Sequence, residues 1–128
     1  MRFLLDTHAF LWWVADDAAL SAGARKAISE PTNECLLSAA SAWEIAIKVS
    51  IGKLTLKADV RRFLPEQLAA NGFESLPVSV AHAARVADLP FHHRDPFDRL
   101  LAAQALEERV AIVSADAVFR KYGVKRIW

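Results

Sequence analysis

The sequence has little cysteine, no excess of one charge and no long uninterrupted apolar stretch. Cys35 is the only cysteine in 128 residues, which excludes a disulfide framework or a cysteine zinc site and favours a reducing compartment such as the cytoplasm. The net charge is only +1, so any nucleic-acid binding must depend on a local surface. Asp6 and His8 interrupt the apolar N-terminal run, which argues against a signal peptide and a membrane span.

Apolar residues are abundant for a chain of this length. They make up 54% of the sequence and include four tryptophans and seven phenylalanines. No linker, repeat or low-complexity segment divides the chain, so we expect one domain over residues 1–128. Because a domain of this size has limited interior, we expect part of the apolar surface to face a partner.

Short apolar runs alternate with helical patterns along the whole chain. The runs predict strands at residues 2–5, 35–38, 74–78, 110–114 and 124–127. Helical spacing and capping residues predict helices at residues 7–14, 21–29, 40–50, 58–70, 79–87, 96–108 and 116–122. This alternation predicts an α/β fold, a three-layer α/β/α sandwich around a mostly parallel central sheet.

Acidic residues occur where predicted helices begin. Asp95 and Asp98 flank the start of the helix at 96–108, in the segment LPFHHRDPFDRLLAAQA at 89–105. Asp6, Glu44 and Asp116 lie at or near other strand-to-helix transitions. Helix capping explains each of these acids locally, and Ser41 with Glu44 has the S-x-x-E spacing of a capping box.

A shared site is the alternative to separate caps. The carboxyl ends of parallel strands meet along one edge of the sheet, so a single crevice could hold these acids. Crowded carboxylates raise one another's pKa, and a divalent cation relieves that repulsion. Oxygen ligands without cysteine favour Mg²⁺ or Mn²⁺, and phosphodiester hydrolysis is the reaction that suits such an ion.

Four segments together resemble the PIN-domain ribonucleases, and VapC-type toxins of bacterial toxin–antitoxin systems in particular. These segments are LLDTH at 4–8, SAWEIAIK at 41–48, HHRDPFDRLLAAQA at 92–105 and SADAVF at 114–119. The resemblance implies a PIN-like fold and a Mg²⁺-dependent endoribonuclease, with Mn²⁺ as an alternative ion. It also implies a small antitoxin partner and a homodimer. The family commonly has Thr where this chain has Ser114, which keeps the hydroxyl.

The same resemblance assigns roles to the acids. Asp6 and Asp98 would be the principal metal ligands, and Asp95 would cap the helix or assist. Glu44 would be a ligand or would orient the attacking water, and Asp116 would be an outer ligand or serve a second ion.

Basic residues near the acids have alternative roles. Lys48 would contact an RNA phosphate or pair with Glu44 one turn earlier. Arg94 and Arg99 are candidates for phosphate contacts, and Arg99 for bracing a carboxylate. Lys53 is expected to be a solvated loop charge.

The neighbouring rings are also open to two interpretations. His92 and His93 would bind RNA or a metal, or form hydrogen bonds within their loop. We expect Trp43 and Phe97 to be core anchors beside the acids. Two rival functions remain on this sequence: a non-catalytic module that binds RNA or a protein, and an aspartyl-phosphate phosphatase. The phosphatase would need a second aspartate at the position of His8.

Overall fold

The computed structural model describes residues 1–128, which form five strands, seven α-helices and one 3₁₀ helix. The strands are β1 (Arg2–Leu5), β2 (Glu34–Ser38), β3 (Glu74–Leu76), β4 (Ala111–Val113) and β5 (Arg126–Ile127). The helices are α1 (Thr7–Val14), α2 (Ala22–Ser29), α3 (Ala39–Ser50), α4 (Val60–Asn71), α5 (Val80–Arg85), η1 (Val86–Asp88), α6 (Pro96–Glu108) and α7 (Val118–Lys121). None of the helices has the length and apolar character that a membrane crossing requires.

The five strands form one sheet with the order β3-β2-β1-β4-β5, and every neighbouring pair is parallel. β1 is central, and its residues Phe3, Leu4 and Leu5 are fully buried. A strand that is apolar on both faces requires helices on both sides, because each face must be removed from water. The prediction of a mostly parallel sheet is therefore confirmed.

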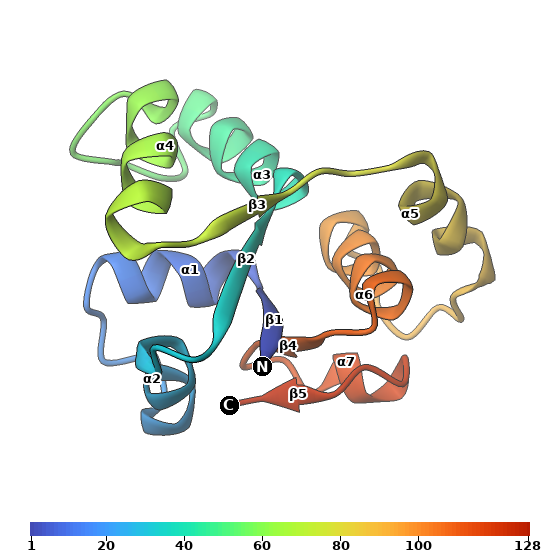
Figure 1. Cartoon of the computed structure of the whole chain (residues 1–128). Helices are drawn as coiled ribbons and strands as arrows, with labels where there is room; N and C mark the ends of the chain where they lie inside the picture. The colour runs from blue at the N-terminus through green and yellow to red at the C-terminus, as the bar shows by residue number, and fades with distance from the viewer.

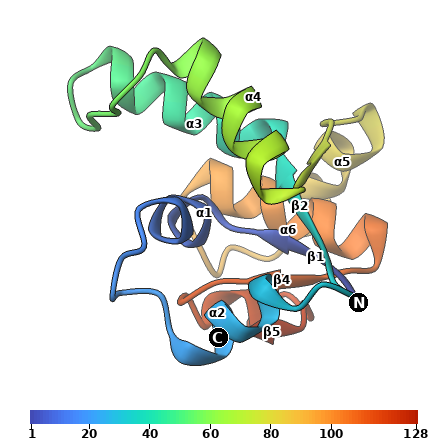
Figure 2. The same cartoon turned by 60° about the vertical axis from the view of Figure 1, so that its left-hand side comes forward.

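Helices cover the two faces of the sheet as separate layers (Figures 1 and 2). Phe3 and Leu5 pack into one apolar cluster with side chains of α1, α2 and α4. Leu4, which points to the opposite face, packs into a second cluster with side chains of α6 and α7. Residues that alternate along a strand thus enter different cores, and the predicted three-layer α/β/α arrangement is confirmed.

The ends of several elements differ from the predicted ranges. The predicted helix at 116–122 begins only at Val118, because the Asp116 carboxylate accepts the Val118 N–H (2.9 Å) and forms a turn first. The predicted helix at 79–87 is α5 followed by the tighter η1, with Ser79 as its N-cap. The last strand is shorter than predicted, because the chain turns at Gly123, whose φ is 81°.

Candidate active site

The four acids singled out in the sequence lie at the carboxyl edge of the sheet. Asp6 directly follows β1, and Asp116 follows β4 after two residues. Glu44 is in the second turn of α3, which continues directly from β2. Because β2, β1 and β4 are neighbours, their carboxyl ends place these three acids at one edge. Asp98, in the first turn of α6, completes the group.

Asp6 is both a helix cap and a member of the acidic group. Its Oδ1 accepts the Ala9 N–H (2.7 Å) at the start of α1, as the capping interpretation predicts. Burial raises the pKa of Asp6, and the charge of Glu44 adds to the rise. Hydrogen bonds from Ser114 and Ala9 act in the opposite direction. Capping occupies one carboxylate oxygen and does not account for this charged environment.

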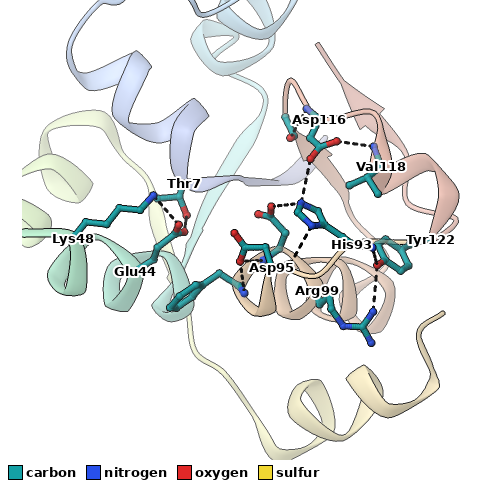
Figure 3. A network of polar contacts seen from close by, with 12 residues as sticks. Thr7, Glu44, Lys48, His93, Asp95, Arg99, Asp116, Val118 and Tyr122 are labelled. Carbon is teal, nitrogen blue, oxygen red and sulfur yellow. Dashed lines mark hydrogen bonds and ion pairs between the residues drawn. The ribbon is translucent and has the colours of Figure 1, made fainter. Parts of the chain in front are cut away.

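Glu44 is buried and held at both of its oxygens. Oε1 accepts a hydrogen bond from the Thr7 hydroxyl (2.6 Å), and Oε2 lies 3.0 Å from Lys48 Nζ (Figure 3). The capping-box interpretation of Ser41 and Glu44 is wrong, because Ser38 is the N-cap and α3 begins three residues earlier. Glu44 therefore belongs to the second turn, where no free backbone N–H is available to it.

Asp98 is the acid with the most perturbed titration. Asp95 takes the capping role at α6, and its Oδ1 accepts the N–H groups of Phe97 (2.8 Å) and Asp98 (3.4 Å). The Asp98 carboxyl is thus not needed as a cap. Burial raises the pKa of Asp98 from 3.8 to about 7, and the charges of Asp95, Asp6 and Glu44 contribute to the rise. Asp95, Asp6 and Glu44 are therefore the acids whose charges act on Asp98.

His93 lies between two of the acids. Its Nε2 is 2.8 Å from Asp98 Oδ2 and 3.3 Å from Asp116 Oδ2 (Figure 3). Its Nδ1 accepts the Asp95 N–H (3.2 Å), so the ring proton is on Nε2 and is shared by the two carboxylates. The His93 N–H in turn donates to Tyr122 Oη (2.9 Å). The sequence left the role of His93 open, and its place before an acid-bearing helix start was the available signal.

Arg99 is not available for phosphate, which corrects the prediction from the sequence. Its side chain is buried, and its guanidinium also contacts the Phe91 ring at 4.3 Å from the centroid. It donates to Tyr122 Oη (3.3 Å). It also donates to the carbonyl oxygens of Pro90 (2.9 Å), Leu89 (3.2 Å) and Val86 (3.3 Å). Arg99 therefore braces the loop that leads to His93, and it contacts no carboxylate.

The remaining predicted residues lie at the surface beside the acids. Lys48 forms the i,i+4 pair with Glu44 that was one of its two predicted roles. Arg94 is exposed, as is Lys53. Trp43 is 62% exposed and meets the Phe97 ring edge-on at 5.4 Å, so the prediction of Trp43 as a core anchor is wrong. α3 buries its opposite face through Ile45.

The donor set fits a small divalent cation. Carboxylate oxygens of Asp98 and Asp116 and a ring nitrogen of His93 all lie within 4.8 Å of one another, and a cation bound by the two carboxylates would displace the His93 proton between them. Burial, and to a lesser extent the neighbouring carboxylates, raises the pKa values of Asp6 and Asp98, and a bound cation would stabilise both charged carboxylates. Carboxylate oxygens are the ligands that Mg²⁺ and Mn²⁺ prefer. A site of this kind suits reactions at phosphate esters.

The chain is similar to proteins of one family along almost its whole length. The PIN domain family model matches residues 3–125. Ribonuclease VapC22 of Mycobacterium tuberculosis (strain ATCC 25618 / H37Rv) is 32% identical over 120 residues, which cover 93% of this chain and 90% of that protein. Ribonuclease VapC16 of the same strain is 40% identical over 60 residues, which cover 47% of this chain and 43% of that protein.

Solved structures share the fold. The VapBC2 structure from Rickettsia felis, bound to a DNA fragment from the VapBC2 promoter, has a TM-score of 0.72 and 14% identity and covers 100% of both chains. The DNA-bound VapBC structure from Salmonella typhimurium has a TM-score of 0.72 and 15% identity, with 98% of this chain and 96% of that chain covered. At such identities the likeness establishes the architecture alone.

Proposed function

Because the chain belongs to the PIN domain family and to its VapC ribonuclease group, we propose that it is an endoribonuclease that hydrolyses RNA phosphodiester bonds with Mg²⁺ or Mn²⁺. One observation carries the metal dependence. Asp98 has a pKa of about 7 because it is buried beside Asp95, Asp6 and Glu44. A divalent cation stabilises the charged form of a buried carboxylate that lies beside other carboxylates.

Asp6 and Asp98 would be the principal ligands of the ion, with Asp116 as an outer ligand or a ligand of a second ion. When bound, the ion lowers the pKa of water and offsets charge on the phosphoryl oxygens. His93 keeps Asp98 and Asp116 next to each other through its Nε2 proton. The chain itself thereby holds two of the ligands close together before any ion binds.

Glu44 is the residue best placed to orient the attacking water. The Thr7 hydroxyl and Lys48 fix its two oxygens, so the carboxylate has one orientation in which to accept a proton. Asp6 is fixed in a similar way by the first turn of α1. Asp6 is at the start of α1 and Glu44 is in the second turn of α3, and side chains fixed on helices favour a preorganised site. Lys48 and Arg94 offer positive charge beside the acids for an RNA phosphate.

We also propose that the protein acts in the cytoplasm as the toxin of a toxin–antitoxin pair, as a homodimer that a small antitoxin inhibits. The VapC ribonuclease relatives and the VapBC structures that share the fold support the toxin–antitoxin part of this proposal. Exposed apolar side chains such as Trp43 and Phe91 are consistent with partner contacts. The rival interaction module would keep the fold without needing the acids.

A growth assay tests this function. Expression of the chain alone should arrest bacterial growth, and co-expression of the small protein encoded beside it should restore growth. Asp6→Asn at matched expression should be harmless, because it removes a ligand charge while Asn still caps α1. Asp59→Asn, at the exposed N-cap of α4, is the matched control and should stay toxic. Equal toxicity from Asp6→Asn would mean that the arrest is not ribonuclease action.

A further inference from the structure

One face of α3 leaves large apolar side chains in solvent next to the acids. Trp43, Ile47 and Ile51 follow one another at four-residue spacing, so they form a stripe along the helix. Trp43 is 62% exposed and Ile51 is 57% exposed. None of the catalytic roles proposed above uses these three side chains.

Ile47 and Ile51 of this stripe line one wall of a groove of about 450 Å³ between α3 and the start of α6, and Trp43 lies beside it against Phe97. Phe97 contributes to the opposite wall, and its ring meets that of Trp43 at 5.4 Å. Glu44 and Asp95 also line the groove, so it lies beside the acidic site. The volume is in the range of pockets that hold a small ligand.

The rim of the groove is cationic. Lys48, Lys53 and Arg94 line it, and only Lys48 has an acidic partner. Neither Lys53 nor Arg94 has a carboxylate within ion-pair distance. Of the two acids in the groove, Glu44 is paired with Lys48 and Asp95 is bound by backbone N–H groups. Two cations are thus left for an anionic ligand.

We propose that this groove binds the nucleotide of single-stranded RNA next to the phosphodiester that is cut. Lys53 and Arg94 hold its phosphate, and the half-buried Phe97 ring contacts its base together with the exposed Trp43 ring packed against it. Apolar and aromatic walls with cations at the rim match single-stranded RNA, whose unstacked bases bind side-chain rings and whose phosphates bind Lys and Arg. Because ring contacts tolerate every base, the subsite fixes the strand without selecting a sequence. This inference rests on the proposed ribonuclease function.

Equilibrium binding to an uncut oligonucleotide tests the subsite. The probe is a short fluorescein-labelled single-stranded RNA, bound to Asp98→Asn protein and followed by anisotropy across a salt series. In that background, Lys53→Ala with Arg94→Ala should weaken binding about ten-fold at low salt. The slope of log affinity against log salt should fall in magnitude by about 0.7, because the two side chains hold one phosphate. Trp43→Ala should weaken binding about five-fold with the salt slope unchanged.

Lys125→Ala is the matched control, because Lys125 is exposed and lines a separate pocket with Met1 and Arg2. It should bind RNA as the Asp98→Asn background does. Unchanged affinity and slope in the Lys53 and Arg94 double variant would overturn the inference. The inference would also fail if those changes weakened antitoxin binding alone, since the groove would then be a protein-binding surface. In both cases, RNA cleavage by a chain that carries Lys53→Ala and Arg94→Ala but keeps Asp98 would leave the ribonuclease function standing.

Discussion

Asp98→Asn should stabilise the metal-free protein, although it removes a proposed ligand. The pKa of Asp98 rises from 3.8 to about 7 on folding, so its charged form is disfavoured in the folded state. A shift of about three units at about 1.4 kcal/mol each costs at most about 4 kcal/mol of unfolding free energy. Asn has no charge to bury, and its side-chain oxygen still accepts the hydrogen bond from His93.

The gain in unfolding free energy from Asp98→Asn should increase as the pH rises. Well below pH 3.8 Asp98 is protonated in both the folded and the unfolded state, so the substitution gains nothing there, and at pH 4 it gains little. The unfolded state loses its proton first as pH rises, and the cost of the folded carboxylate is complete above pH 7. Because the Asp98 side chain is 25% exposed, we expect a gain of about 2 to 4 kcal/mol at pH 8.

Urea unfolding in EDTA at pH 4 and pH 8 measures this difference. Asp59→Asn is the control, since Asp59 is an exposed N-cap where Asn caps equally well, and it should change stability by less than about 0.5 kcal/mol. Added Mg²⁺ should stabilise the unmutated chain, by about 2.7 kcal/mol at a hundred times its Kd, and Asp98→Asn much less. An Asp98→Asn protein that is destabilised at pH 8, or equally affected at both pH values, would refute the reasoning.

Two further substitutions examine the residues around the acids. Arg99→Lys should lower the free energy of unfolding in urea by about 2 to 4 kcal/mol, because an ammonium group cannot donate to three carbonyl oxygens and Tyr122 at once. A loss below about 0.5 kcal/mol would contradict the bracing role. His93→Asn should bind Mn²⁺ several-fold more tightly by calorimetry, because the Nε2 proton competes with a cation for Asp98 and Asp116; unchanged or weaker binding would contradict this competition.

Local sequence rules were sufficient where a capping residue and an apolar pattern agreed. Asp95, Pro96 and the apolar run after them predicted α6 at 96–108, and the structure has those bounds. Asp6 likewise marked the start of α1. These features depend on neighbours within one turn, which is the range that sequence patterns describe.

The errors came from contacts between distant segments. Ser41 and Glu44 have capping-box spacing, but Thr7, from another helix, takes the Glu44 carboxylate instead. Arg99 was a candidate for a phosphate contact or for bracing a carboxylate because it flanks Asp98, yet the loop carbonyl oxygens and Tyr122 surround it. Sequence spacing does not show which loop folds over a helix start.

The central interpretation, that grouped acids cut RNA with a divalent cation, is tested most directly by cleavage of a labelled single-stranded RNA. The measurement uses purified protein free of antitoxin, in EDTA and then with Mg²⁺ or Mn²⁺ titrated back. We predict no cleavage in EDTA, recovery with the metal, and no cleavage by identically purified Asp98→Asn at any metal concentration. Cleavage that persists in EDTA, or that Asp98→Asn retains in full, would contradict this interpretation.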